Sequence, residues 1–170
     1  MSQRKECAER QTANQTGQTD DEALKVRRVV AGNPNTPKQI LVRLAGDECM
    51  RIRRIVAENP KTPLDVLHKL AHDSHPDVRL AVAENRNTPS ETLSLLAKDD
   101  HADVRYGVAE NPHMPEDILF FLCQDDNPYV RCRAQKTMQK LDPDVRSRMR
   151  HLIQQVYLGS LNTTFHVEIV

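Results

Sequence analysis

The stretch VRLAVAENRNTPSETLSLLAKDDHAD, residues 78–103, is one period of a repeat that runs through most of the chain. The preceding period, residues 52–77, reads IRRIVAENPKTPLDVLHKLAHDSHPD, and the following one, residues 104–129, reads VRYGVAENPHMPEDILFFLCQDDNPY. An apolar β-branched residue followed by Arg opens five repeats in the same 26-residue register, at Val26, Ile52, Val78, Val104 and Val130. A fixed period in the twenties is typical of a solenoid, in which each repeat buries its apolar face only by stacking on its neighbours.

Each repeat predicts two short helices. Asn59-Pro60 cannot continue a helix, because Pro lacks an N–H and pushes the residue before it out of the α region. Thr62 is then a suitable N-cap, with Pro63 in the first helical position. A second helix is expected to begin near Val78, so the repeat is helix–turn–helix and each helix needs stacking for its stability. In two repeats a capping box is expected as well, from Gln39 and Glu91.

Every repeat carries an Asp and an Arg six residues apart. The pairs are Asp47 and Arg53, Asp73 and Arg79, Asp99 and Arg105, Asp125 and Arg131. The arginines could form a phosphate-binding stripe. Alternatively, each Asp pairs with the Arg of its own or an adjacent repeat and accepts hydrogen bonds from the turn. We favour this ladder, because an acid recurs at fixed spacing from every arginine. The asparagine column is expected to hold the following loop through side-chain bonds, at Asn33, Asn59, Asn85 and Asn111.

The pattern predicts an all-α fold, an α-solenoid of about five 26-residue helix–turn–helix repeats over residues 21–137. Residues 1–20 end in a polar Gln/Thr/Asn-rich stretch and are expected to be disordered. An amphipathic helix is predicted over residues 138–159 from the apolar spacing of Val145, Met149 and Leu152, and it would cap the open end of the stack. Residues 160–170 form a tail.

The pattern VRxxVAxNPxTPxxxLxxLAxD resembles the leucine-rich repeat variant family over roughly residues 21–135. The resemblance implies short α and 3₁₀ helices that alternate in a right-handed superhelix. The Asp–Arg spacing is also similar to HEAT repeats, including those of the phycobilisome-lyase type. Some family members hold an iron–sulfur centre in an amino-terminal cysteine cluster. This chain has only Cys7 there, so no cofactor is expected.

The composition narrows the function classes. Lys+Arg and Asp+Glu both total 24, so no net charge attracts polyanions. The charge is uneven, however, with eight basic and five acidic residues in 21–60, six and thirteen in 61–130, and seven and two in 131–150. The chain has no Trp and 4% aromatic residues, which argues against a base-stacking module or a base-flipping glycosylase. Without a CxxC pair, a signal-type segment or a long apolar run, a reducing cytoplasm and no membrane are expected.

No catalytic residues are predicted, because no nucleophile–base pair, paired-carboxylate site or phosphate loop stands out. His75 and His101 fall in one column near Asp73 and Asp99 and could approach a metal ion together. The column continues as Cys49 and Asn127, so we interpret it as a variable loop position and predict no metal site.

The expected function is a non-enzymatic repeat scaffold for protein–protein interaction, with a protein partner and an open oligomeric state. The candidate partner-binding residues on the second helices are Arg28, Arg54, Leu80 and Tyr106, with Cys132 in the same column. Two adjacent rings on a first helix, Phe120 and Phe121, are candidates as well. Either a partner or the chain's own carboxyl-terminal segments would cover Phe120 and Phe121. Nucleic-acid binding through the basic ends is the alternative, by way of Arg27, Arg28, Arg51, Arg53 and Arg54. A HEAT-like accessory or lyase protein is the second alternative.

Overall fold

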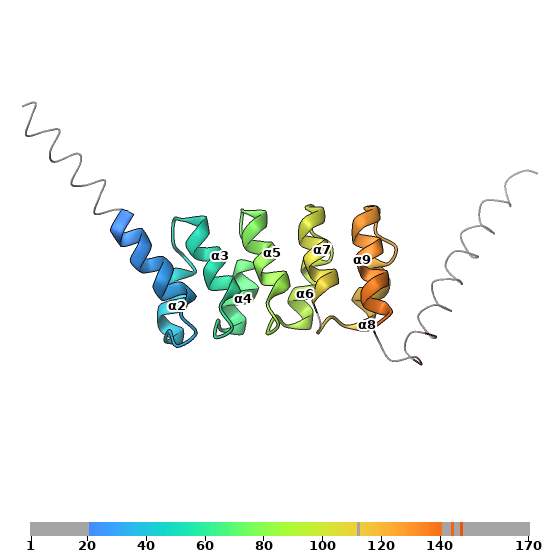
Figure 1. Cartoon of the computed structure of the whole chain (residues 1–170), viewed down its shortest axis with the longest axis horizontal. Coiled ribbons are helices and arrows are strands. Elements are labelled where there is room, and N and C mark those ends of the chain that lie inside the picture. The colour runs from blue at the N-terminus through green and yellow to red at the C-terminus, as the bar shows by residue number, and fades with distance from the viewer. Residues whose placement is uncertain (1–20, 112, 141–143, 145–146, 148–170) are drawn as a thin grey trace, which may run out of the picture. The chain divides into compact units, whose positions relative to one another are not determined.

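The computed structural model describes residues 21–111, 113–140, 144 and 147. In this part of the chain all regular secondary structure is helical, and the fold is an all-α repeat solenoid (Figure 1). The predicted amino-terminal segment and tail lie outside the described residues, as does nearly all of the predicted capping helix. Within the described part, no helix is long and apolar enough to cross a membrane.

Each repeat contributes a short first helix and a longer second helix. Residues 21–32 form the second helix of the opening repeat. The first helices have seven residues each and are α2 (Lys38–Leu44), α4 (Leu64–Leu70), α6 (Ser90–Leu96) and α8 (Glu116–Leu122). The second helices are α3 (Met50–Glu58), α5 (Pro76–Glu84), α7 (Ala102–Glu110) and α9 (Pro128–Met138).

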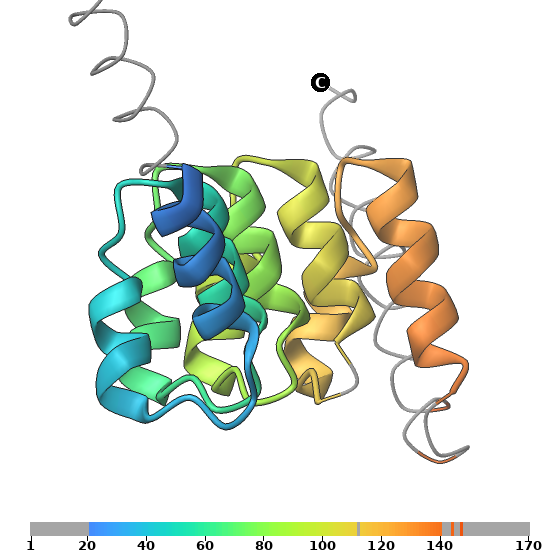
Figure 2. The ribbon, with the colours of Figure 1, turned by 60° about the vertical axis from the view of Figure 1, so that its left-hand side comes forward.

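The chain divides into two compact units between Thr88 and Pro89. In unit 1 the second helices α3 and α5 pack against each other, and α2 and α4 pack on their inner side. In unit 2 α7 packs against α9, and α6 and α8 support them in the same way. Figure 2 shows this layering within each unit, with second helices side by side and first helices beneath them.

The core is built from columns of the repeat. The leucine column is buried in both units, at Leu41, Leu67, Leu93 and Leu119. Second helices bury Ile52 and Val56 in α3, and their equivalents in α5 and α7 are buried as well. Full burial of one such side chain is worth about 1.5–3 kcal/mol. Helices of seven to eleven residues are marginal alone, so this stacking is what stabilises them.

The first helices are α-helices, so the α/3₁₀ alternation implied by the family resemblance does not describe these repeats. In α4, the Leu67 N–H donates to Pro63 O at 3.0 Å, and the Ala71 N–H donates to Leu67 O at 2.9 Å. These i→i−4 bonds place Val66 and Leu70 on one buried face, four residues apart. A 3₁₀ turn would instead align residues three apart and would turn one of these side chains outward.

The predicted threonine N-caps and capping boxes are wrong. Pro63 is the N-cap of α4, and no side chain caps this helix. The Thr62 hydroxyl points backward instead and donates to Val56 O at 2.5 Å. Thr36 and Thr88 do the same toward Val30 and Val82. The reason is that Val56 O, at the end of the second helix, accepts the Asn59 N–H at 3.1 Å and has a second lone pair, to which the buried Thr62 hydroxyl donates.

The last second helix, α9, has eleven residues, against nine in α3, α5 and α7. It runs to Met138, and Thr137-Met138 stands where Asn-Pro stands at residues 33–34, 59–60 and 111–112. Thr137 nevertheless stands in the asparagine column, 26 residues after Asn111. Its hydroxyl donates to Ala109 O at 2.7 Å, which shows that the column keeps part of its bonding role at the place where the repeat sequence decays.

Candidate functional site

Two sets of intrachain bonds form the framework on which any functional surface rests. Arg53 binds Asp73 of the following repeat through a fork, Nε to Oδ2 at 2.6 Å and Nη2 to Oδ1 at 2.9 Å. Arg105 binds Asp125 in the same way, at 2.7 and 2.9 Å. Two-point arginine–carboxylate pairs are among the stronger hydrogen bonds in proteins. The ladder predicted from the Asp–Arg spacing is confirmed in both units.

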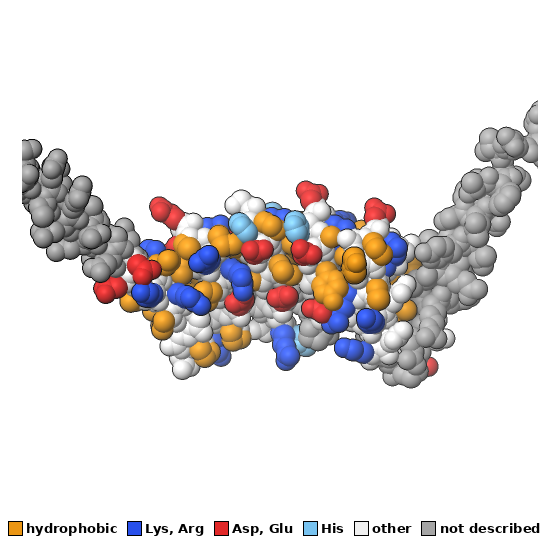
Figure 3. Space-filling model, turned by 45° about the horizontal axis from the view of Figure 1, so that its top comes forward, with side chains coloured by type: hydrophobic (Ala, Val, Ile, Leu, Met, Phe, Trp, Pro, Cys, Tyr) orange, Lys and Arg blue, Asp and Glu red, His pale blue; other side chains and the backbone are white. Residues whose placement is uncertain are grey.

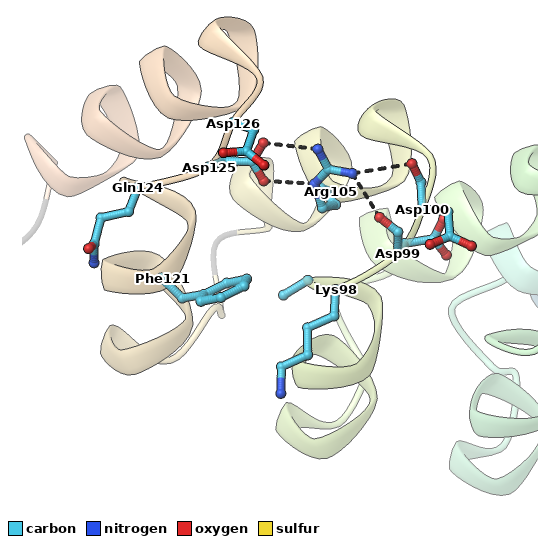
Figure 4. Close-up of a pocket in the computed structure, with 9 residues that line it drawn as sticks. Lys98, Asp99, Asp100, Arg105, Phe121, Gln124, Asp125 and Asp126 are labelled. Atoms are coloured by element: carbon cyan, nitrogen blue, oxygen red, sulfur yellow. Dashed lines mark hydrogen bonds and ion pairs between the residues drawn. The ribbon is translucent and has the colours of Figure 1, made fainter.

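The third guanidinium nitrogen of each arginine holds the turn before its own helix. Arg53 Nη1 donates to Asp47 O at 2.9 Å, and Arg105 Nη1 donates to Asp99 O at 2.8 Å. Arg79 and Arg131 make the equivalent backbone contacts. Figure 4 shows Arg105 between two turns, bound to Asp125 on one side and to backbone oxygens of residues 99 and 100 on the other. These guanidiniums are therefore engaged in holding the fold and do not form a phosphate-binding stripe.

The ladder carboxylates have lowered pKa values. Burial alone would raise the pKa of Asp73, but the hydrogen bonds from Arg53 and from the His75 N–H outweigh it. The pKa of Asp125 is lowered in the same way, by Arg105 and the Asn127 N–H acting against burial. The hydrogen bond to Asp73 raises the pKa of Arg53 further above its ordinary value. Both pairs are thus ionised at neutral pH.

The asparagine column forms a second, buried ladder. Asn59 Nδ2 donates to Ala31 O at 2.7 Å and to Asn33 O at 3.0 Å, both in the preceding repeat. Its Oδ1 accepts from the Lys61 N–H at 2.9 Å, which is the local loop bond expected from the sequence. Asn85 repeats the two donor contacts one repeat later, to Ala57 O and Asn59 O. The asparagines therefore join repeats as well as fixing their own loops.

The variable second-helix positions lie at or near the surface. Arg28, Arg54 and Cys132 are exposed, and Leu80 and Tyr106 are half-buried. Figure 3 shows basic, acidic and hydrophobic side chains interspersed on the face that it draws. This column is Arg, Arg, Leu, Tyr and Cys along the chain, while the framework columns stay nearly the same.

In unit 1, Arg28 and Arg54 line one groove. The groove lies between the helix of residues 21–32 and α3 and has a volume of about 370 Å³. Its lining combines Leu24 and Ile55 with three arginines, of which Arg51 is the third. One carboxylate, Glu58, lies at its edge and binds Arg54 Nε at 2.7 Å.

At the equivalent position in unit 2, between α7 and α9, the chain has an arginine. Arg133 stands where Ile55 stands in unit 1, three periods earlier. Its guanidinium lies 5.9 Å from the centre of the Tyr106 ring and binds Glu110 Oε1 at 2.8 Å. A cation over an aromatic face gains further attraction, so this side chain has favourable contacts on two sides.

Phe121 and Phe120 do not form one continuous pair of exposed rings. Phe121 is 48% exposed and lines a hollow of about 590 Å³ with Lys98 and Asp126, where its ring points toward Lys98 (Figure 4). Phe120 is half-buried. The carboxyl-terminal segments expected to cover these rings lie outside the described residues, so the choice between tail and partner stays a prediction.

The column that suggested a metal site lies at the starts of the second helices. Cys49, His75, His101 and Asn127 are the N-cap residues of the second helices, and His75 and Asn127 accept backbone N–H bonds there. Cys123 occupies the buried alanine column, and burial raises the pKa of its thiol to about 11. Among the described residues no group of three His, Cys, Asp or Glu side chains is arranged to hold a metal ion.

A family model described as "Leucine rich repeat variant" matches residues 51–75 and 76–101. Residues 51–101 of the chain are therefore similar to two leucine rich repeat variant units. Those two matches cover the part of the chain from α3 to α6, where the Asn, Thr-Pro, Leu and Asp columns are all intact.

A solved structure titled "A leucine-rich repeat variant with a novel repetitive protein structural motif" is 27% identical to this chain. The match covers 74% of this chain and 64% of that protein, with a TM-score of 0.32. The chain therefore spans less than two thirds of that protein's length. No curated protein matches the chain.

The sequence analysis missed the groove of unit 1. It singled out Arg28, Arg54 and Tyr106 from one column but did not consider the neighbouring column of Ile55 and Arg133. In unit 1 that column contributes Ile55 to the groove lining, and in unit 2 it places Arg133 against Tyr106. The available signal was the arginine at position 133 in a column that otherwise has apolar residues or Gly.

Proposed function

We propose that this repeat scaffold binds another protein through the exposed side chains of its second helices. The observation that carries the proposal is that some positions of the repeat form bonds between repeats, while others on the same helices lie at or near the surface. Repeated Arg, Asp and Asn side chains are used in bonds between repeats, as in Arg53–Asp73 and Asn59–Ala31. One column at or near the surface of the same helices varies along the chain, as Arg28, Arg54, Leu80, Tyr106 and Cys132.

The residue types at these positions suit binding. Arginine and tyrosine are enriched in protein interfaces because they combine a large contact area with hydrogen bonding. The framework holds the helices at a regular spacing, so Arg54 on α3 and Leu80 on α5 meet a partner with little loss of backbone freedom. We infer that the role is recognition, since the repeat fold supplies a surface and the variable columns supply its specificity.

Site-specific photo-crosslinking in cells that express the full chain tests this proposal. A photoreactive phenylalanine derivative at the position of Leu80 or Tyr106 should form an adduct with one protein partner. The matched control places the same group at Asp65 on α4 or Asp117 on α8, which are exposed on first helices. Adducts from the control positions alone, or from none of the four, contradict a second-helix binding surface.

Nucleic-acid binding is a second candidate, favoured by the exposed arginines Arg28, Arg51 and Arg54. It is weakened because Arg53 is committed to Asp73, and because Arg27 Nε lies 3.3 Å from Asp47 Oδ2. This reading predicts an affinity for oligonucleotides that falls steeply with salt. Absence of oligonucleotide binding at low salt removes it.

A further inference from the structure

The groove of unit 1 is open because residue 55 is short and apolar. Ile55 and Leu24 contribute an apolar strip between the helix of residues 21–32 and α3. Figure 1 shows these two helices side by side at the start of the described chain. In α7 and α9 the equivalent column has the longer, charged side chain of Arg133, which lies against Tyr106.

The residues that line the groove carry more positive than negative charge. Arg28, Arg51 and Arg54 stand against the single carboxylate of Glu58, which is already bound to Arg54. Within the described residues, Arg28 and Arg51 have no hydrogen-bond or ion-pair partner. Two guanidiniums are therefore available, each able to bind a carboxylate at two points.

The positions of these side chains define the shape of an occupant. Arg51, Ile55 and Glu58 follow one another at i, i+4 and i+7 along α3, and Leu24 and Arg28 are four residues apart on the facing helix. The apolar strip lies between arginines contributed by both helices. A segment that places one or two aliphatic side chains on the strip can bring carboxylates to Arg28 and Arg51 at the same time.

A nucleic acid suits this groove less well. Leu24 and Ile55 offer no interaction to a sugar-phosphate backbone, and no Phe, Tyr or Trp lines the groove to stack on a base. An acidic peptide segment uses both the apolar and the basic parts of the lining, because aliphatic side chains bury against the first and carboxylates pair with the second.

We propose that the groove between residues 21–32 and α3 is the docking site for an acidic, amphipathic segment of a partner protein. This inference rests on the proposed function and names the class of partner segment. Leu24 and Ile55 receive its aliphatic side chains. Arg28 and Arg51 bind its carboxylates, while Arg54 remains held by Glu58.

The test selects binders from a displayed library of random linear peptides on the full chain. The enriched peptides are then measured individually by fluorescence polarisation. We expect Asp or Glu flanking Leu, Ile or Phe in the enriched peptides. The variant Arg28→Glu/Arg51→Glu/Arg54→Glu should lose at least about tenfold in affinity, which corresponds to 1.4 kcal/mol. Its matched control, Arg43→Glu/Lys61→Glu/Lys69→Glu, changes net charge equally at exposed sites elsewhere in unit 1 and should bind as the parent does.

A second variant separates an apolar groove from a purely basic surface. Leu24→Ser/Ile55→Ser keeps every charge and should weaken peptide binding about tenfold or more, while any binding of a labelled single-stranded oligonucleotide should be unchanged. Unfolding midpoints establish that each variant is folded. Enriched peptides without acidic residues, equal losses in the control variant, or peptide binding that survives both groove variants overturns the proposal. Crosslinking at Leu80 or Tyr106 that persists in the groove variants leaves the scaffold function standing and removes only the groove.

Discussion

Unit 1 and unit 2 share their framework bonds and differ in the surface that lies over them. The forks Arg53–Asp73 and Arg105–Asp125 have nearly the same distances, 2.6 and 2.9 Å against 2.7 and 2.9 Å. On the second helices, unit 1 has an open groove lined by Ile55, and unit 2 has Arg133 bound to Glu110. The comparison teaches that bonds between repeats restrict the framework columns, while the neighbouring columns can change without altering the backbone they stand on.

The largest effect is expected where the framework is buried most completely. Asn59→Ala removes an amide that is 3% exposed and leaves Ala31 O and Asn33 O without its donor bonds. Each buried group left unsatisfied costs about 1–3 kcal/mol, so the free energy of unfolding should fall by about 3 kcal/mol. Thr137→Ala, in the same column of unit 2, removes the single bond to Ala109 O and should cost about 1 kcal/mol.

Urea denaturation of both variants measures these losses. Asn87→Ala is the control, because the Asn87 amide is exposed and bonds only to the exposed Pro60 carbonyl. The free energy of unfolding of this control should fall by about 0.5 kcal/mol. Equal losses for Asn59→Ala and Asn87→Ala would show that the asparagine ladder does not join the repeats.

The next effect tests whether the two units share one framework. Arg53→Ala and Arg105→Ala each leave a carboxylate that is less than 10% exposed, Asp73 or Asp125, without its two-point partner. We expect a loss of about 2 kcal/mol for each. Arg51→Ala, which removes an exposed arginine from the same helix as Arg53, should change stability by less than about 0.5 kcal/mol. A marked difference between the stability losses of Arg53→Ala and Arg105→Ala would show that the two units do not share one framework.

Much of this framework could be predicted from the sequence, because its bonds follow the period. The Asp–Arg spacing predicted the ladder, and the apolar residue that opens each repeat indicated the core, with Ile52 and Val78 buried. The direction of the Thr62 hydroxyl was not predictable in the same way. A threonine before proline fits an N-cap by local rules, but a carbonyl six residues back in the chain competes for the same donor. Tertiary proximity decided that choice.

The candidate surface was only partly predictable, for a related reason. Exposed positions have no repeat-wide bond that fixes their orientation, so a column identifies residues without saying which of them line one groove. Arg28 and Arg54 were found, but their relation to Leu24 and Ile55 depends on how two helices stack. The adjacency of Phe120 and Phe121 in sequence likewise suggested one patch, whereas neighbours in a helix point about 100° apart, and only Phe121 is well exposed.

A smaller effect is expected on lowering the pH. The pKa values of Asp73 and Asp125 are lowered in the folded state, so an unfolded chain takes up protons at these sites at higher pH than the folded chain does. Their contribution is complete above the ordinary carboxyl pKa of about 4 and is lost as the pH falls below it toward the lowered values. The loss should be smaller than in the arginine variants, because a neutral carboxyl group still accepts a hydrogen bond.

The measurement is the urea midpoint between neutral and acid pH for the parent and for Asp73→Asn/Asp125→Asn. The variant should be less stable at neutral pH, and its stability should change less as the pH falls through the acid range. An unchanged slope means that the ladder carboxylates titrate as free groups. Replacing only one of the two aspartates should give about half of the change in slope, because the two pairs are built alike.

The smallest effect on stability is expected at position 133, where unit 2 differs from the equivalent position 55 of unit 1. Arg133→Ile gives unit 2 the residue that unit 1 has, and it removes a pair whose side chains are 26% and 34% exposed. Such partly solvated pairs contribute little, so we expect a loss of about 0.5–1 kcal/mol. Reaction of Tyr106 with tetranitromethane, followed by mass spectrometry, should become faster once the guanidinium no longer lies over the ring. Unchanged Tyr106 reactivity means that Arg133 does not close the groove.

The bonds of the asparagine ladder depend on relative position along the chain. Asn59 reaches back 28 residues to Ala31 and 26 residues to Asn33, and Asn85 makes the same steps from its own place. If residues 52–77 were excised, Asn85 would stand 28 residues after Ala31 and would face the carbonyls that Asn59 had faced. Loss or duplication of one whole period restores each such pairing, whereas an insertion of any other length separates donors from acceptors. A gene encoding this chain can therefore change the protein's length in steps of one repeat by unequal recombination, and every product inherits a complete set of partners.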